Sequence, residues 1–355
     1  MRVQLIYNPV AGQGDIAEQL PRVVELLESQ GWDVTVRKTL GPGDATTYAR
    51  EAVAHNYDMC VAMGGDGTLG EVANGLAHSS CIMGVLPTGT GNVWARMLNL
   101  PYWTPLNPDA LVEATHALIN GVVHSIDLGR AAGRYFILWL GVGLDAQVAH
   151  DVEPHRDIRR TLGNLTYLVT TIALSFTLRG TRLTISVDDR SVRLRTLMVV
   201  VTNAQLYGPA LRLAPNARLD DGWLEVYIFK GGNILDVLRH FGSMVIGRHT
   251  RDPKVEIYRA RRIEIRGESP QPLHMDGEPM GNIPVTIEVV PRALRVMVPL
   301  QAPASLFEEG THPHQEELNL AQRIAAHVRQ GGERWLEEGK QIRHDLERRL
   351  HRPTQ

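Results

Sequence analysis

One stretch decides the fold of this chain: residues 58–76 read DMCVAMGGDGTLGEVANGL. The apolar run at 58–63 has the length and composition of a buried strand, and the glycines that follow it end that strand. Apolar residues then recur at helical spacing from Leu69 to Leu76. A strand, a glycine-rich loop and a helix in direct succession are the repeating unit of a parallel α/β sheet, and the stretch predicts one such unit.

The rest of the first hundred residues repeats this unit. Three more strands are expected, at Val3–Tyr7, Trp32–Arg37 and Cys81–Leu86, and three more helices, at Ile16–Glu28, Asp44–His55 and Val93–Leu98. Because parallel strands need crossovers between them, this order predicts an N-terminal α/β nucleotide-binding domain with a parallel sheet over residues 1–127.

Beyond residue 127 the pattern changes to short alternating runs separated by glycine, proline and aspartate turns. The expected strands are Tyr135–Leu140, Arg182–Val187, Leu194–Val201, Trp223–Phe229, Arg262–Ile265, Val285–Val290 and Ala293–Val298. Regularly spaced short strands predict a mostly antiparallel β-sandwich over residues 128–300, with helical insertions around 160–178 and 233–247. Residues 301–355 are expected to form a linker and a charged helical tail.

The composition excludes several classes of protein. The chain has 355 residues with 37 Lys and Arg against 39 Asp and Glu, so no global positive charge favours a nucleic-acid partner. Cys60 and Cys81 lie in strand-like apolar runs, which predicts buried reduced thiols and a cytoplasmic protein. No secretion signal is recognised, and the apolar run Leu165–Leu178 is shorter than the roughly 20 residues that cross a bilayer. That run is interpreted as a buried helix or the wall of an apolar pocket.

Three glycine-rich loops each follow an expected strand and precede an expected helix. They are Asn8–Gly12 (NPVAG), Gly64–Thr68 (GGDGT) and Thr88–Asn92 (TGTGN). In a parallel sheet all three project from the carboxyl edge, where ligands of open α/β folds bind. Glycine permits close backbone approach, and helix N-termini offer free N–H groups to an anion. One such loop would be an ordinary turn, but three together predict a phosphate site.

Asp66 is the most informative residue of these loops, because its carboxylate lies between glycines at a strand end. Thr68, Glu71 and Asn74 follow at a spacing that places them on one helix face. One interpretation is that Asp66 only caps its helix. An anionic side chain among phosphate-facing amides is more useful beside a cation, so we interpret Asp66 as a residue on the Mg²⁺ side of the site.

Two competing nucleotide motifs fail. No lysine follows any of the three loops, so the Walker pattern is absent. Residues 12–17 fit the dinucleotide fingerprint after a strand, but no acidic residue closes the second strand, which runs into Lys38. A dehydrogenase is therefore disfavoured.

In this order the motifs make the chain resemble the diacylglycerol kinase catalytic-domain family, which includes bacterial lipid kinases, sphingosine kinases and ceramide kinases. The resemblance continues through Gly141–Ala146 (GVGLDA), Pro215–Gly222 (PNARLDDG) and Asp276–Glu278 (DGE), and covers about residues 1–300. NAD kinases share the GGDGT segment, but the serine- and threonine-rich segment of their second domain is not found here. The family has an α/β nucleotide domain and a β-sandwich, with the active site in the cleft between them.

The resemblance implies an ATP site on the loops of the first domain. Its expected contacts are Asn8, Pro9, Val10, Ala11, Gly12, Thr39, Gly64, Gly65, Asp66, Gly67, Thr68, Leu69, Gly70, Glu71, Thr88, Gly89, Thr90 and Asn92. It also implies a metal loop formed by Arg218, Asp220, Asp221 and Trp223, in which the side chain of Asp221 is flanked by backbone carbonyls. Asp145 matches a position near the lipid head group, although it also fits a solvated turn residue.

The resemblance further places the catalytic base in the DGE tripeptide, which in isolation would be a turn signal. Phosphoryl transfer to an alcohol asks a carboxylate to accept the hydroxyl proton while Mg²⁺ neutralises phosphate charge. We therefore expect catalysis from Asp276, Glu278 and Asp66. Asp276 is the preferred base, and the choice between it and Glu278 stays open. One departure is Val93, where many bacterial members have an aspartate that joins the metal network.

The sequence thus predicts an ATP- and Mg²⁺-dependent lipid kinase that transfers the γ-phosphoryl group to a hydroxyl of a lipid such as diacylglycerol or a sphingoid base. NAD kinase and a noncatalytic lipid- or nucleotide-binding regulator are the alternatives. The expected partners are a lipid substrate and, transiently, a membrane surface, with no nucleic acid. The balanced charge of the tail predicts a helix that docks on its own protein or on the second subunit of a homodimer.

Overall fold

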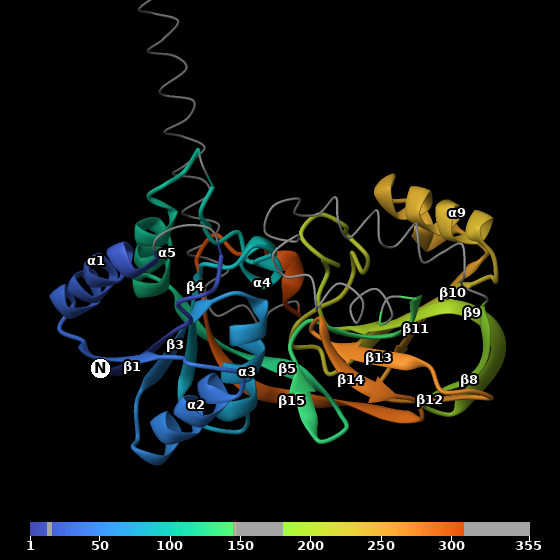
Figure 1. Cartoon of the computed structure of the whole chain (residues 1–355), viewed down its shortest axis with the longest axis horizontal. Helices are drawn as coiled ribbons and strands as arrows, with labels where there is room; N and C mark the ends of the chain where they lie inside the picture. The colour runs from blue at the N-terminus through green and yellow to red at the C-terminus, as the bar shows by residue number, and fades with distance from the viewer. Residues whose placement is uncertain (13–15, 105, 145, 147–179, 309–355) are drawn as a thin grey trace, which may run out of the picture. The chain divides into compact units, whose positions relative to one another are not determined.

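The computed structural model describes residues 1–12, 16–104, 106–144, 146 and 180–308 (Figure 1). The helical insertion around 160–178, the tail helix and Asp145 lie outside the described residues. No described helix is long and apolar enough to cross a membrane.

A parallel sheet of four strands forms the N-terminal half. The strands lie in the order β2 (Asp33–Lys38), β1 (Arg2–Tyr7), β3 (Met59–Gly64) and β4 (Ile82–Pro87). Every residue of β3 is buried, as in parallel sheets that helices cover on both faces. Because β1, β3 and β4 are neighbours, the three glycine loops that follow them leave the sheet side by side.

Helices cover both faces of this sheet (Figure 1). On one face α1 (Ile16–Ser29) and α5 (Ala110–Ile119) share an apolar core with β1 and β3. On the other face α2 (Asp44–Ala54) and α3 (Asp66–Leu76) pack closely, since a Cβ on Gly75 would lie 2.4 Å from the Cβ of Ala49. The short helix α4 (Val93–Met97) follows the third glycine loop.

One long strand joins the two halves of the protein. β15 (Val285–Val298) pairs in parallel with β4 through Val296 and Met83, and antiparallel with β5 (Val122–Ala131) and β12 (Arg262–Gly267). The two strands expected at 285–290 and 293–298 are therefore one strand, with an irregularity between Val290 and Leu294. Through β15 the parallel and antiparallel strands form one continuous 15-stranded sheet.

Antiparallel strands form the second half and enclose their own apolar core, to which Leu183, Ile185 and Val187 of β8 contribute. Besides β5 and β12 they are β6 (Arg134–Phe136), β7 (Trp139–Gly143), β8 (Thr181–Val187), β9 (Arg190–Thr202), β10 (Leu224–Lys230), β11 (Val255–Ala260), β13 (Pro272–Met275) and β14 (Glu278–Asn282). Helix α9 (Ile234–Val245) and the 3₁₀ turns His249–Arg251 and Ala304–Leu306 complete the described elements. The predicted combination of an α/β domain and a mostly antiparallel β-sandwich is confirmed.

The N-terminal half agrees closely with the sequence prediction. All its expected strands and helices begin and end within one residue of the observed ones, except that α3 begins at Asp66, because the glycine loop itself forms the first helical turn. Cys60 and Cys81 are free and buried, as predicted.

The second half agrees less well. Beyond residue 127 the sequence does not predict β11, β13 or β14, and before that residue it also misses α5 and most of β5. The expected strand Tyr135–Leu140 is instead a corner, because β6 ends at Phe136 and β7 begins at Trp139.

Candidate active site

The three glycine loops pack directly against one another at the carboxyl edge of the parallel sheet. Gly12 has a φ of +82°, and a Cβ there would lie 1.7 Å from the carbonyl oxygen of Thr88. A Cβ on Gly89 would lie 2.5 Å from the Cα of Gly65. The third loop therefore touches both of the others at points where only glycine fits.

Polar contacts link the same loops and leave two buried atoms unpaired. Asn8 Nδ2 donates to Thr68 Oγ1 (3.2 Å), which joins the first loop to the second. Asn92 Nδ2 donates to the carbonyl oxygen of Gly89 (2.7 Å) within the third loop. Among the described residues, the buried Thr88 Oγ1 and Asn92 Oδ1 have no hydrogen-bond partner. Since such atoms are costly to leave unpaired, they indicate a place for a polar ligand.

The other expected ATP contacts differ in exposure. Pro9, Val10, Gly67 and Thr90 are exposed, whereas Gly64, Leu69 and Gly70 are buried and Ala11 lies between these extremes. The loop tips are therefore open to a ligand while their bases are packed. The contacts with ATP themselves stay predictions.

Asp66 stabilises the start of a neighbouring helix. It is the first residue of α3, yet its carboxylate accepts hydrogen bonds from the amides of Val93 (3.0 Å) and Trp94 (3.1 Å) in α4. The N-cap of its own helix is Gly65. Asp66 is thus a cap, but of α4 rather than of the helix that contains it. Val93 takes part through its backbone N–H, so this contact does not depend on the side chain at that position.

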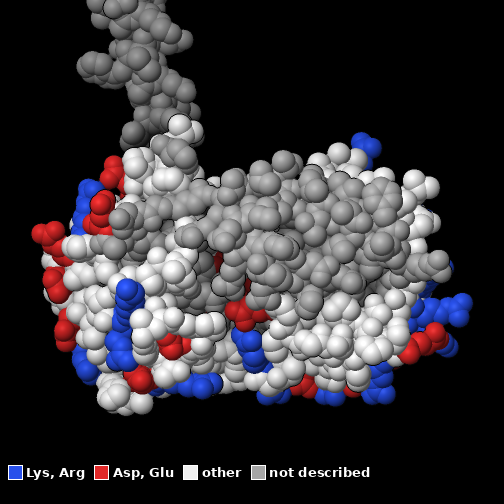
Figure 2. Space-filling view, in the orientation of Figure 1, with Lys and Arg blue, Asp and Glu red and all other residues white. Residues whose placement is uncertain are grey.

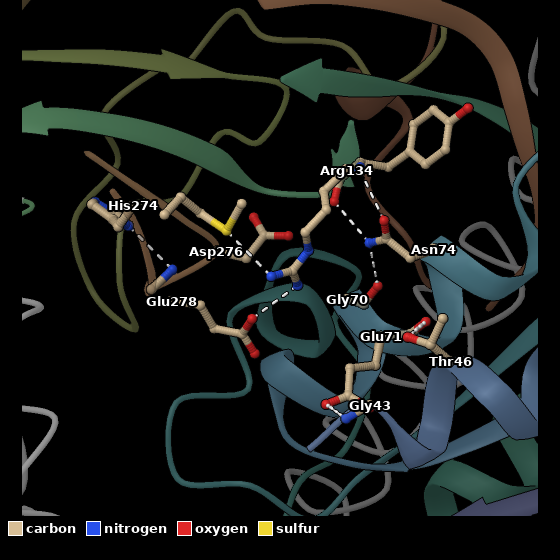
Figure 3. Close-up of polar contacts among 12 residues, drawn as sticks. Gly43, Thr46, Gly70, Glu71, Asn74, Arg134, His274, Asp276 and Glu278 are labelled. Carbon is tan, nitrogen blue, oxygen red and sulfur yellow. Dashed lines mark hydrogen bonds and ion pairs between the residues drawn. The ribbon is translucent and has the colours of Figure 1, made fainter. Parts of the chain in front are cut away.

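Glu71 and Thr39, two expected ATP contacts, have partners within the protein. Glu71 accepts hydrogen bonds from the amides of Gly43 (3.0 Å) and Ala45 (3.1 Å), so its carboxylate stabilises the start of α2 (Figure 3). Thr39 is buried after β2, and its amide donates to the carbonyl oxygen of Tyr7 (3.0 Å). Both residues therefore help to shape the loop edge, whatever contact they make with a ligand.

Asp276 is held by three backbone amides. It lies in the turn between β13 and β14 with a φ of +49°. Its Oδ2 accepts the amide of Ile137 (2.9 Å), and its Oδ1 accepts those of Leu138 (2.9 Å) and Trp139 (3.0 Å). These amides are available because the chain turns its corner there, between β6 and β7. Burial raises the pKa of Asp276 to about 6 against the effect of the three donors, and the negative charge of Asp66 adds to this shift.

Asp276 and Glu278 face the first turns of α3 across a narrow gap (Figure 3). A Cβ on Gly70 would lie 3.6 Å from Asp276 Oδ2, and one on Gly67 would lie 3.7 Å from Glu278 Oε1. Because both residues are glycines, α3 carries no side chain where the carboxylates approach it, and we call this part the bare first turns of α3. A cavity of about 10 Å³, the space of one water, lies among these residues. The structure thus brings together the GGDGT loop and the DGE turn, which are far apart in the sequence.

Two more residues of this cleft belong to none of the sequence motifs. Arg134 donates from Nη2 to Glu278 Oε2 (2.9 Å) and from Nη1 to Met280 Sδ (3.2 Å) (Figure 3). Asn74 donates to the carbonyl oxygen of Tyr135 (2.8 Å) and accepts the amide of the same residue (2.9 Å). Asn74 thereby fixes α3 to β6, the strand that carries Arg134. The helix-face spacing gave a signal for Asn74, but nothing local in the sequence links Arg134 to the DGE turn.

The expected metal loop is tied to protein groups. Asp221 Oδ1 accepts the amide of Trp223 (3.1 Å), and its Oδ2 pairs with the guanidinium of Arg259 (2.5 Å). Arg259 Nε also lies 3.1 Å from Glu225 Oε1. Burial raises the pKa of Asp221, and the charge of Arg259 opposes that shift. A cation at Asp221 would have to compete with this guanidinium and draw on the backbone carbonyls of Arg218 and Trp223.

Asp220 points to other partners. Its Oδ2 lies 2.7 Å from His124 Nε2, and its Oδ1 accepts the amide of Glu308 (2.7 Å). Among the described residues, no group of three or more His, Cys, Asp or Glu side chains is arranged to hold a metal ion. The metal role of residues 218–223 therefore stays a prediction.

Known proteins resemble this chain over both halves. Residues 2–131 match the family model of the diacylglycerol kinase catalytic domain, and residues 139–298 match the YegS C-terminal NAD kinase beta sandwich-like domain. A diacylglycerol kinase of Bacillus subtilis is 31% identical over 300 residues, which are 84% of this chain and 96% of that protein. One from Staphylococcus saprophyticus is 30% identical over 84% of this chain and 95% of its own length.

A solved structure shows the same arrangement. A putative diacylglycerol kinase from Bacillus anthracis is 26% identical and has a TM-score of 0.69, over 84% of this chain and 97% of its own. Similarity of this extent in sequence and fold, together with the glycine loops and the DGE turn in one cleft, establishes the family. The chain belongs to the diacylglycerol kinase catalytic-domain family and is a lipid kinase of that family, a phosphotransferase with an alcohol group as acceptor.

Proposed function

We propose that this protein uses ATP and Mg²⁺ to phosphorylate a hydroxyl of diacylglycerol, with a sphingoid base as the second acceptor class. One observation carries the proposal: Asp276, a carboxylate with a raised pKa, faces the bare first turns of α3 at the glycine loops. The relatives named diacylglycerol kinase favour that lipid over a sphingoid base. Because the substrate lies in a membrane, we propose a cytoplasmic enzyme that contacts the bilayer surface transiently.

Asp276 is the proposed base. Three amides fix the direction of its carboxylate. A pKa of about 6 leaves it mostly ionised at neutral pH and still able to take a proton. The lipid hydroxyl oxygen would bond to the γ-phosphorus as its proton passes to Asp276, and the bond to ADP would break with its electrons going to ADP. Glu278 is the weaker candidate, because Arg134 already neutralises its charge.

The loops are proposed to hold the phosphates of ATP. The N-terminus of α3 lies at the second loop, and its partial positive charge favours an anion. Thr88 Oγ1 and Asn92 Oδ1 are buried polar atoms that lack partners among the described residues. The close packing of Gly12 on Thr88 and of Gly89 on Gly65 keeps the loop backbones together, so their amides can act on one ligand.

The cleft also suits a divalent cation. Asp66 and Asp276 are like charges close enough for the first to raise the pKa of the second, and a cation would relieve that repulsion. Asp66 is the residue we expect to hold it, because its carboxylate lies at the start of α3, next to the third glycine loop. When bound, Mg²⁺ would neutralise the charge of the β- and γ-phosphates.

The test is phosphate transfer by the purified protein from labelled ATP in the presence of Mg²⁺. Diacylglycerol, sphingosine and ceramide are offered in mixed micelles, and NAD is offered in a parallel tube. We expect labelled phosphatidic acid as the main product, formed about 10²–10⁴ times more slowly by Asp276→Asn. Labelled NADP alone, or no labelled lipid with any acceptor, would contradict the proposal.

A further inference from the structure

Helix α9 (Ile234–Val245) turns two of its polar side chains toward the protein. Asp236 is buried and accepts hydrogen bonds from Lys254 Nζ (2.5 Å) and from the amide of Gly232 (3.0 Å). His240 is buried too, and its Nε2 lies 2.8 Å from the carbonyl oxygen of Lys230. These two polar groups therefore help to attach the helix to the sandwich, beside the buried Val237 and Met244.

Apart from Arg239, which pairs with Asp252, the outward side of α9 is mainly apolar. Leu235, Leu238, Val245 and Ile246 are 72%, 48%, 58% and 64% exposed. They are four of the nine large hydrophobic side chains that are exposed in the described part of the chain. Their spacing places them on one side of the helix and its end, and we call them the α9 face. Apolar side chains gathered in this way on a surface mark a place of interaction.

Unpaired positive charge borders the α9 face. Arg248 and Arg251 follow the helix, both are exposed, and neither side chain forms an ion pair with a described residue. The neighbouring acidic residues are already paired, Asp252 with Arg239 (2.8 Å) and Asp236 with Lys254. Figure 2 shows uncharged surface beside a basic side chain at the upper right, where α9 lies in Figure 1. The α9 face therefore suits a partner that is apolar and negatively charged.

We propose that α9 docks on an anionic lipid bilayer. Leu235, Leu238, Val245 and Ile246 enter the boundary of the acyl chains, while Arg248 and Arg251 contact lipid phosphates. With a formal net charge of −2, the chain as a whole has no attraction for such a surface, so the local patch has to provide it. The inference rests on the proposed function in one respect, that a lipid kinase must reach a substrate held in a bilayer.

The test is cosedimentation with sucrose-loaded vesicles, carried out without ATP. Vesicles of equal parts phosphatidylcholine and phosphatidylglycerol are compared with vesicles of phosphatidylcholine alone. We expect the double variant Leu235→Gln/Ile246→Gln to lower the partition onto anionic vesicles about tenfold, because it removes two apolar side chains that would enter the bilayer. Arg248→Gln/Arg251→Gln should lower it about tenfold on anionic vesicles and leave the weaker binding to phosphatidylcholine unchanged.

Two controls keep the outcome clear. Leu106→Gln changes a side chain that is 97% exposed outside the α9 face and should bind as the wild type does. Asp276→Asn should also bind vesicles as the wild type does. If the wild type binds vesicles but phosphorylates no lipid, that result contradicts only the proposed function. Unchanged partition of both double variants overturns the docking proposal. It is equally overturned if Leu235→Gln/Ile246→Gln binds vesicles fully but separates a dimer in sedimentation velocity, which would make the α9 face a subunit interface.

Discussion

Arg134 and Glu278 form an ion pair of 2.9 Å across the cleft from the bare first turns of α3. The other terminal nitrogen of Arg134 lies 3.2 Å from the thioether sulfur of Met280, which is a weak acceptor. A phosphoryl oxygen would engage that N–H more strongly, since bonds between ionised groups are the strong ones. The guanidinium of Arg134 would thereby lie beside the transferred phosphoryl group, next to the proposed base.

Replacement of Arg134 by methionine should therefore lower kcat for lipid phosphorylation about a hundredfold, the usual cost of losing one donor to developing charge. Arg134→Lys should restore part of the rate, because it keeps the charge but loses the planar fork. The matched control is Arg130→Met, which breaks a comparable pair with Glu288 (2.8 Å) on the same hairpin. Steady-state kinetics decide the matter, and equal losses in the two methionine variants would refute a role at the phosphoryl group.

The raised pKa of Asp276 predicts how activity depends on pH. A base must be ionised, so kcat/KM should rise with pH through about 6 and then level off. Glu278→Gln should keep the same midpoint, whereas Asp276→Asn should lose about 10²–10⁴ in rate. Rates measured between pH 5 and 8 test this. A shift in the midpoint of the pH dependence in Glu278→Gln would indicate Glu278 as the base instead.

The same shift has a consequence for stability. The pKa of Asp276 is higher in the folded chain than its ordinary value of 3.8, so the folded state holds this proton more tightly than the unfolded state does. The stability due to protonation is present below the unfolded pKa and is lost as pH rises through about 6.

Alanine at Gly12 should damage the ATP site. The Cβ would meet the carbonyl oxygen of Thr88 at 1.7 Å and would strain a positive φ, so the first and third loops would have to separate. We expect KM for ATP to rise at least tenfold. Gly31→Ala is the matched control, since Gly31 also has a positive φ (+75°) but has open space around its Cβ position. It should cost about 1–2 kcal/mol of stability and leave KM unchanged. Thermal unfolding and ATP titrations separate the two effects.

Arg259→Met should destabilise the fold. It leaves the buried carboxylates of Asp221 and Glu225 without their shared guanidinium, a loss of about 3 kcal/mol or more. Arg261→Met is the control, because Arg261 stacks on the ring of Trp223 at 4.5 Å, a contact that contributes about 0.5–1 kcal/mol. Urea unfolding measures both variants.

The same pair of variants tests the expected metal loop. If residues 218–223 accept a cation, added Mg²⁺ should raise the midpoint of Arg259→Met toward that of the wild type. An unchanged midpoint at every Mg²⁺ concentration would count against a cation at Asp221.

The sequence predicted the first domain well because each of its units is local. In β3 an unbroken apolar run ends at two glycines, and the helix follows at once, so periodicity and turn signals agree. The second domain offers no such agreement. β13 and β14 are four and five residues long, and β14 contains Pro279 and Gly281, which interrupt the alternation of a strand.

Part of the candidate site was beyond sequence reasoning for a related reason. Three glycine-rich loops at one edge of a sheet predict a ligand site from the sequence, but the role of Glu71 at the start of α2 exists only once two helices pack. Arg134 becomes a cleft residue only when β6 lies beside the DGE turn. Both roles arise from contacts between segments distant in the chain, and no spacing rule encodes them.

The shared strand β15 also has a consequence for how the protein is made. The edges of β4 and β5 that pair with β15 have no partner until the ribosome has synthesised Val298. At about 5–20 residues per second, synthesis from Ala131 to Val298 takes roughly 10–30 s. During that interval the nascent N-terminal half carries two open strand edges, which favour pairing with other chains. The enzyme is therefore expected to depend on chaperones while it emerges, and its two halves are not expected to fold as independent modules.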